Sequence, residues 1–247
     1  IGGVNQQTLL GNRVQFQDGT IGVIYSDRNT DRSKVFPLSK HYIDVGANSR
    51  EDCPISVGDA AGFVRPSYAQ GQRVTGKAMD DRIGCVVAIE TLKGLETTPH
   101  DVFFVFSVQE EVGVRGATVA ANLIKPNIGI ALDVTMTGDV HKGIDMAVGL
   151  GLGPAIKAKD GGMISHVGLV QHMKSTAQSI DLPYQIEVLI GGSTDARAMQ
   201  IASAGCIAGC ISIPCRYVHS QSETIDMVDV EGSVALLRTI LENEIPI

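Results

Sequence analysis

Residues 102–134 read VFFVFSVQEEVGVRGATVAANLIKPNIGIALDV, and this stretch decides the fold class. Its first seven residues are mostly β-branched or aromatic and carry no charge, which predicts a strand buried on both faces of a parallel sheet. Residues 115–124 then predict a short helix, and residues 128–134 predict a second strand. A strand, a helix and a strand in this order indicate an α/β fold.

The same alternation continues from about residue 68 to the end of the chain. The apolar spacing predicts further helices over residues 82–95, 168–180, 194–205 and 228–244, and further strands over residues 184–190 and 209–214. We therefore expect residues 68–247 to form a three-layer α/β catalytic domain with a mainly parallel sheet. The glycine-rich run GLGLGP, residues 149–154, has no βαβ frame around it and predicts a flexible connection instead of a dinucleotide loop.

Residues 1–67 follow a different pattern. Short alternating runs are broken by turn signals, such as the Asp18-Gly19 pair between NRVQFQ and TIGVIYS. This pattern predicts a small all-β domain at residues 1–67. The sequence opens at Ile1 without an initiator methionine, and we expect it to be a fragment of a longer protein.

Composition and charge exclude several partners. The net charge is −7 and no lysine or arginine tract follows the chain, so we expect no nucleic-acid partner. The longest apolar run, residues 201–214, is too short to span a bilayer, so we expect no membrane partner. The five cysteines lack the spacing of a disulfide framework, and no signal peptide opens the chain, which predicts reduced thiols and a cytoplasmic protein.

Ionisable side chains follow several of the predicted strands. In an open α/β sheet, ligands bind beyond the carboxyl ends of the strands, so side chains placed there can converge on one site. Four separate segments deliver such side chains to this edge, namely Asp80 and Asp81, Glu110 and Glu111, Asp133, and His219. Oxygen and imidazole ligands without thiolates suit zinc, cobalt or manganese. One glutamate of the adjacent pair can bind a metal while the other acts as a general base.

Each of these residues also has an ordinary structural alternative. The glutamate pair can lie in a solvated loop, and one of Asp80 and Asp81 can cap the helix that follows. Asp133 can be the buried partner of a basic residue, and His219 can be an ordinary loop histidine. The other five histidines lack a neighbouring carboxylate context and are interpreted as structural.

Five motifs resemble those of a known family. They are TGKAMDDR at residues 75–82, SVQEEVGVRGA at 107–117, IALDVTMTGD at 130–139, GGSTDA at 191–196 and SIPCRYVHS at 212–220. In this order they resemble the tetrahedral (TET) aminopeptidases of the glutamyl or deblocking type. That family consists of two-metal exopeptidases, some of whose members have been labelled endoglucanases. The resemblance runs from Ile1 to the C-terminus.

The resemblance implies a role for each residue of the cluster. Asp80 bridges two divalent ions, Glu111, Asp133 and His219 are terminal ligands, and Glu110 is the general base that acts on a metal-activated water. Asp81 follows a strained peptide and orients Asp80. The fold implied is a catalytic α/β domain with a small inserted β-barrel of the dimerisation type, which residues 1–67 resemble. Peptides are the implied substrates, and the full-length protein is implied to be a homododecamer built from dimers.

Two departures from the family pattern affect these expectations. GGSTDA replaces the more usual GGGTDA, and its residues Gly192, Thr194 and Asp195 are expected beside the substrate pocket. The family's first motif, a histidine two residues before an aspartate, is absent, since His41 in HYID lies in the β-domain with the wrong spacing. We therefore expect an absent N-terminal segment and one incomplete metal site.

Three functions remain to be distinguished. The first is a metal-dependent aminopeptidase that removes N-terminal residues from peptides. The second is a glycoside hydrolase of the endoglucanase type, but its two carboxyl groups must lie about 5–9.5 Å apart across a sugar, whereas Glu110 and Glu111 are adjacent and the chain has no tryptophan. The third is a non-catalytic fragment or subunit, which the absent histidine leaves open.

Overall fold

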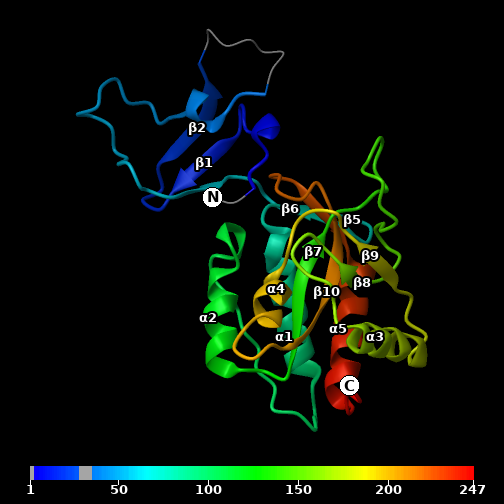
Figure 1. Cartoon of the computed structure of the whole chain (residues 1–247). Coiled ribbons are helices and arrows are strands. Elements are labelled where there is room, and N and C mark those ends of the chain that lie inside the picture. The colour runs from blue at the N-terminus through cyan, green and yellow to red at the C-terminus, as the bar shows by residue number, and fades with distance from the viewer. Residues whose placement is uncertain (1–2, 28–34) are drawn as a thin grey trace.

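The computed structural model describes residues 3–27 and 35–247 (Figure 1). Two sheets are present. The smaller one uses residues from the first quarter of the chain, and the larger one uses residues 68–226. Short 3₁₀ turns occur at η1 (Gln6–Thr8), η2 (Leu38–Lys40) and η3 (Glu110–Val112).

The smaller sheet is antiparallel and has the strand order β3-β2-β1-β4. Its strands are β1 (Arg13–Phe16), β2 (Ile21–Ser26), β3 (His41–Asp44) and β4 (Ala61–Phe63). Alternate residues of β1 and β2 point inward, and Leu9, Val14, Phe16 and Ile24 form a small core. The described residues form an open sheet, with β3 and β4 at its edges. They do not show the barrel expected for residues 1–67. Residues 1–2 and 28–34 of that range lie outside the described part.

The larger sheet has seven strands in the order β5-β6-β11-β10-β8-β9, with β7 paired to β10. These strands are β5 (Tyr68–Gln70), β6 (Arg73–Gly76), β7 (Ile128–Thr135), β8 (Ala155–Lys159), β9 (Gln185–Val188), β10 (Ile207–Arg216) and β11 (Glu223–Asp226). Only the β7–β10 and β8–β9 pairs are parallel, and the other four pairs are antiparallel. The sheet is therefore mixed, and the prediction of a mainly parallel sheet was wrong.

Helices cover both faces of this sheet. They are α1 (Met79–Gly94), α2 (Arg115–Ile124), α3 (Val167–Ser179), α4 (Asp195–Gln200) and α5 (Met227–Glu242). Helices α1, α3 and α5 bury one face over a large apolar core that includes Val87, Leu169, Ile211 and Leu236. On the other face, Ala196 of α4 packs in a smaller cluster, and α2 packs against α4 (Figure 1). The domain has the three layers that the sequence predicts.

Residues 102–108, predicted to be a strand buried on both faces, form no strand. Val102 and Phe104 pack against the large core, whereas Phe103 is 65%, Phe106 52% and Val108 67% exposed. A continuous apolar run supplies the side chains of a buried strand, but it does not supply the neighbouring backbone that a strand must pair with. Among the described residues, this segment packs against the large core on one side, and its other side is exposed.

Two further findings concern the whole of the described chain. None of its helices combines the length and the apolar character needed to cross a membrane. The five cysteines are all free.

The glycine-rich run at residues 149–154, predicted to be a flexible connection, is held in place. Gly151 and Gly153 donate backbone hydrogen bonds of 2.8 Å to the Asp229 carboxylate.

Candidate metal centre

Three side chains from distant parts of the sequence meet above the sheet. Asp80 stands at the entry of α1, Glu111 lies in η3, and His219 follows β10. His219 Nε2 lies 3.3 Å from Asp80 Oδ2 and 3.4 Å from Glu111 Oε2. These three residues each offer one donor atom, and the atoms all lie within 4.8 Å of one another, so one ion can contact all three. Glu111 and His219 are exposed, which leaves the group open to a substrate.

A second group lies deeper and shares Asp80. It consists of Asp80, Asp81 and Asp133, whose donor atoms also lie within 4.8 Å of one another. Asp133 is the sixth residue of β7, and its Oδ1 accepts a 2.8 Å bond from Val134 N. Burial raises the pKa of both Asp81 and Asp133 well above the usual range, and the charges of the neighbouring carboxylates raise them further.

Asp81 also performs the helix-capping role considered for it. Asp80 and Asp81 have non-helical backbone angles, so the regular part of α1 begins after them. Asp81 Oδ1 accepts a 3.1 Å bond from Gly84 N, three residues further on, which satisfies one of the free amides at the helix start. The peptide bond between Asp80 and Asp81 is cis.

Glu110 lies beside the first group but belongs to neither. Burial raises its pKa to about 7, and the negative charges of Asp195, Glu111 and Asp80 contribute to the increase. Its neighbour Glu111 is shifted in the opposite direction, because a hydrogen bond from His219 lowers the Glu111 pKa. The two adjacent glutamates therefore have different electrostatic environments.

The segment that carries His219 is held in an uncommon backbone conformation. Tyr217 has φ 60° and His219 has φ 64°, both in the left-handed region. Hydrogen bonds to Asp80 and Glu111 raise the pKa of His219 to about 10. Asn5 N donates to His219 O at 3.2 Å, so the start of the described chain packs on this segment.

Glu223 lies in this region too, although no sequence pattern identified it. It is 2% exposed, and its carboxylate accepts hydrogen bonds from the backbone amides of Asp80 and His219. The available signal was its spacing, four residues after a predicted ligand in HSQSE. That signal is weak, because most glutamates near a histidine are surface residues.

The residues expected beside the substrate pocket lie at the start of α4. Gly192 is exposed with φ 67°, and Thr194 is buried and caps the helix through a 3.3 Å bond from Ala196 N. Asp195 accepts a hydrogen bond from Ser107 Oγ, which joins α4 to the segment that precedes Glu110. Their place beside a substrate stays a prediction.

The donors fit divalent metal ions. The two groups offer carboxylate oxygens and one imidazole nitrogen, which are ligands that zinc, cobalt and manganese accept. Burial raises the pKa values of Asp81 and Asp133, and the neighbouring carboxylates raise them further, so a cation held here would stabilise the ionised forms of both.

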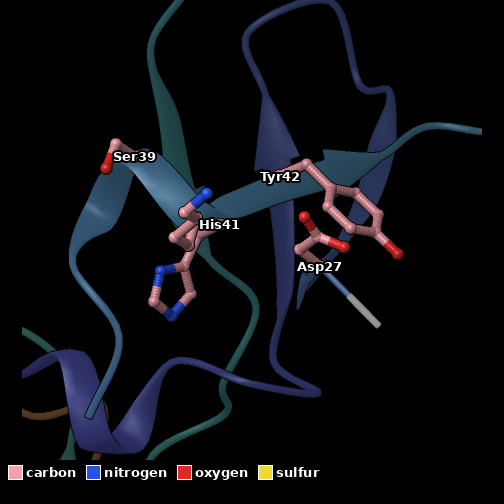
Figure 2. Close-up of a pocket in the computed structure, with 5 residues that line it drawn as sticks. Asp27, Ser39, His41 and Tyr42 are labelled. Carbon is pink, nitrogen blue, oxygen red and sulfur yellow. The ribbon is translucent and has the colours of Figure 1, made fainter. Parts of the chain in front are cut away.

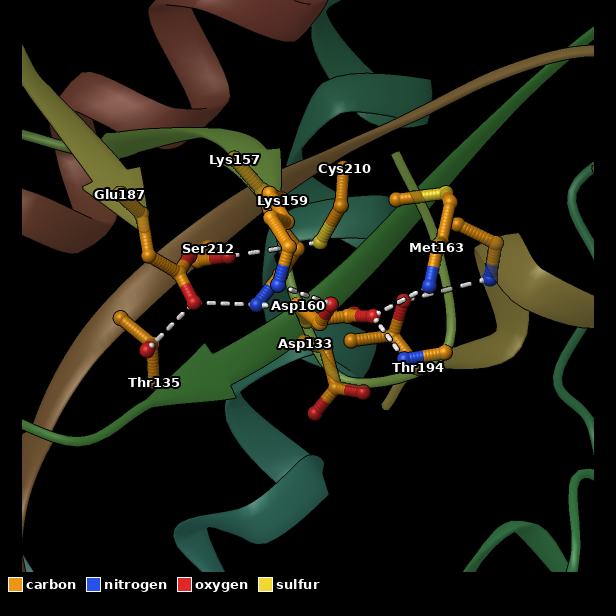
Figure 3. Close-up of polar contacts among 12 residues, drawn as sticks. Asp133, Thr135, Lys157, Lys159, Asp160, Met163, Glu187, Thr194, Cys210 and Ser212 are labelled. Atoms are coloured by element: carbon orange, nitrogen blue, oxygen red, sulfur yellow. Dashed lines mark hydrogen bonds and ion pairs between the residues drawn. The ribbon is translucent and has the colours of Figure 1, made fainter. Parts of the chain in front are cut away.

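A buried polar network lies on the α4 side of the sheet, close to Asp133 (Figure 3). Lys157 of β8 donates to the Glu187 carboxylate of β9, and Thr135 Oγ1 of β7 lies 2.8 Å from the same oxygen. Asp160 Oδ2 lies 4.0 Å from Lys157 Nζ. Figure 3 shows these side chains in a row across the strands, with Asp133 below them.

A separate hollow of about 540 Å³ lies on the smaller sheet (Figure 2). Its lining residues are Asp27, Ser39, Lys40, His41 and Tyr42. His41 Nδ1 lies 3.1 Å from the Pro37 carbonyl oxygen, and Asp27 is the one carboxylate of the lining. Among the described residues, those that line this hollow form no group of metal ligands, and the interpretation of His41 as structural stays a prediction.

Comparisons with known proteins agree with this chemistry. Residues 1–236 match the family model described as M42 glutamyl aminopeptidase. A putative aminopeptidase of Acetivibrio thermocellus is 44% identical over 96% of this chain and 72% of its own length. An aminopeptidase structure from the archaeon Desulfurococcus kamchatkensis is 40% identical, with a TM-score of 0.92 over 100% of this chain and 72% of that one. The Pyrococcus horikoshii TET1 peptidase, which can assemble into a tetrahedron or a large octahedral shell, is 32% identical with a TM-score of 0.86, over 99% of this chain and 76% of that one.

Proposed function

Because the chain belongs to the M42 glutamyl aminopeptidase family and is a metal-dependent aminopeptidase, we propose that the two donor groups at the sheet edge form its catalytic centre. The observation that carries this proposal is that Asp80 belongs to both groups. If each group held an ion, Asp80 would be a ligand common to both sites, which is a usual arrangement in two-metal hydrolytic sites.

In this proposal each ion has its own ligands besides Asp80. Glu111 and His219 complete the first site, which then has three protein ligands, the number found in catalytic zinc sites. Asp133 is the terminal ligand of the second site. Asp81 lies within reach of that site and orients Asp80 through its place at the start of α1.

Glu110 is the general base of the proposed mechanism. Divalent ions held by these donor groups would supply Lewis acidity for the attack of water on the peptide carbonyl. Glu110 accepts a proton from the attacking water and passes it to the nitrogen of the leaving amine, which completes hydrolysis without a covalent intermediate. Glu110 is half-buried beside the first donor group, where a carboxylate can both take and return a proton. Asp195, held by Ser107, borders Glu110 and is proposed to line the substrate pocket together with Gly192 and Thr194.

The two sites are expected to differ in affinity for zinc, cobalt or manganese. The described donors of the second group are carboxylates only, whereas the first group includes an imidazole, which borderline metals favour. We expect one tightly held ion and one weaker ion. Elemental analysis after dialysis tests this expectation, and two tightly held equivalents would contradict it.

We also propose how the chain is organised and where it acts. Residues 1–67 form a β-domain of the dimerisation type and residues 68–247 the catalytic domain, which is supported by the two sheets having no strand in common. The similarity to the TET1 peptidase supports a homo-oligomer, with a dodecamer as the specific proposal. Five free cysteines support a cytoplasmic location. Light scattering tests the assembly, and a monomer of the full-length protein would contradict it.

Two substrates and a chelator test the enzymatic proposal. We expect release of p-nitroaniline from amino-acid p-nitroanilides, loss of this activity with a chelator and its return with added zinc or cobalt. Carboxymethyl-cellulose should remain intact. Chelator-resistant activity would refute the metal-dependent mechanism, and cleavage of the cellulose would favour a glycosidase.

A further inference from the structure

Glu223 connects two residues of the first donor group without belonging to that group. Its Oε1 accepts a 2.8 Å bond from His219 N, and its Oε2 accepts a 3.1 Å bond from Asp80 N. The side chain is buried, and both carboxylate oxygens are engaged. One carboxylate thus joins the backbones of two segments that lie far apart in the sequence.

Neither of these backbones is fixed by regular secondary structure. Asp80 has φ −78° and ψ 105° at the entry of α1, where the helical pattern has not yet begun. His219 has φ 64°, a conformation that few residues other than glycine adopt and that needs support from its surroundings. Besides the direct 3.3 Å contact between the His219 and Asp80 side chains, the two amides bonded to Glu223 are therefore backbone contacts that hold the two residues at a defined separation.

The backbone of Glu223 is itself well anchored. It is the first residue of β11 and pairs with Gly76 of β6, while the next two residues, Thr224 and Ile225, also pair with β10. Residues of β6 and β10 lead directly into the Asp80 and His219 segments. The carboxylate therefore projects from a fixed strand into the gap between two less regular segments.

We propose that Glu223 is a positioning residue that sets the distance between Asp80 and His219 and so prepares the first donor group to bind its metal ion. The inference rests on the proposed function in one respect, that these two residues are metal ligands. Partners of metal ligands commonly affect metal affinity by about 10- to 100-fold. We expect a loss of that size when the double hydrogen bond is broken.

Two substitutions separate position from charge. Glu223→Gln keeps the side-chain size, but its amide nitrogen cannot accept a hydrogen bond, so one of the two backbone amides loses its partner. Glu223→Asp keeps the charge, but it is one methylene shorter and cannot reach both amides. If position matters, both variants bind zinc and cobalt about 10- to 100-fold more weakly than the wild type.

Asp229→Asn is the matched control. Asp229 is also a fully buried carboxylate that accepts two backbone amides, those of Gly151 and Gly153, but neither belongs to a donor group. We expect this variant to keep wild-type metal affinity. A merely structural role for Glu223 would change the thermal stability of the metal-free protein and leave metal affinity unchanged.

Metal affinity is measured by competition with a chromogenic chelator, and circular dichroism verifies the fold of each variant. Wild-type affinity in Glu223→Asp would overturn the proposal, because charge alone would then suffice. An equal loss in Asp229→Asn would overturn it as well. A wild-type protein that binds no metal would instead refute the ligand assignment, and with it the proposed function.

A second measurement needs no variant at position 223. In the metal-free wild type, hydrogen exchange should be slow at the amides of Asp80 and His219, because both are bonded to the buried carboxylate before any ion arrives. Exchange at the rate of a free peptide at either amide would overturn the proposal, whatever the variants show.

Discussion

Replacement of Lys157 by methionine tests the buried polar network beside the metal centre. The Lys157 side chain is 1% exposed and that of Glu187 is 0% exposed. Without the ammonium group, Glu187 keeps only the Thr135 hydroxyl on one oxygen, and its Oε2 already lacks a hydrogen-bond partner. Removal of one member of a buried ion pair destabilises a protein by about 3–5 kcal/mol, because the remaining charge is left uncompensated.

This free energy corresponds to a lowering of the melting temperature by about 6–20 °C for a chain of this size. The free energy of unfolding is measured by urea denaturation with a chelator present, because a bound metal ion adds its own stabilisation. Lys159→Met is the control. Lys159 lies two residues further along the same strand and is exposed, so its replacement should change the stability by less than about 0.5 kcal/mol.

The double variant Lys157→Met with Glu187→Met gives a sharper test. Since it removes both charges of the pair, we expect it to be more stable than Lys157→Met alone. Two results would refute the reasoning. One is a loss below about 1 kcal/mol for Lys157→Met, and the other is a double variant whose loss equals the sum of the single losses.

Three further predictions concern catalysis, pH dependence and thiol reactivity. Glu110→Gln should lower turnover by at least about 100-fold and keep metal binding, whereas Glu111→Gln should lose metal, and calorimetry showing equal metal loss in both would contradict their separate roles. Burial raises the pKa of Asp229 to about 6, above its ordinary value of 3.8, so its stabilising contribution is complete below pH 4 and is lost as the pH rises through 6. In urea titrations between pH 4 and 7, the free energy of unfolding of the wild type should fall by up to about 3 kcal/mol more than that of Asp229→Asn, which cannot titrate at this position. A difference between the two proteins that does not change with pH would contradict this prediction. Cys210 and Cys215 are fully buried, and burial raises the pKa values of their thiols. Iodoacetamide should therefore modify at most three of the five thiols in the native protein. Rapid modification of a fourth thiol would show that Cys210 or Cys215 is accessible.

Local patterns predicted the elements with strong periodicity. The strand expected at residues 128–134 is β7 (Ile128–Thr135), and the helix expected at residues 115–124 has those bounds. The sequence also named the six ionisable residues that the structure brings together, because they follow apolar runs or precede a helix within recognisable motifs. These features depend on neighbours in the sequence.

Features that depend on distant partners were missed. The strands β8 (Ala155–Lys159) and β11 (Glu223–Asp226) are short and contain charged residues, and pairing with β10 on one side and with β9 or β6 on the other makes them strands. Lys157 and Glu187 are charged yet buried, since each compensates the other, and single-sequence patterns do not reveal such a pair. Residues 102–108 are the opposite case. Their apolar side chains predict a strand, but the segment pairs with no strand in the described chain.

The left-handed backbone at His219 limits how the metal preference of this centre can be redesigned. At φ 64°, histidine, asparagine and aspartate are tolerated better than most other residues with a side chain. A thiolate ligand introduced as His219→Cys would meet a backbone strain of about 1–3 kcal/mol in addition to its new chemistry. An aspartate fits the same backbone and presents a harder oxygen ligand, of the kind that manganese and magnesium prefer. The conformation of one residue thus makes redesign towards hard metals easier than redesign towards soft ones.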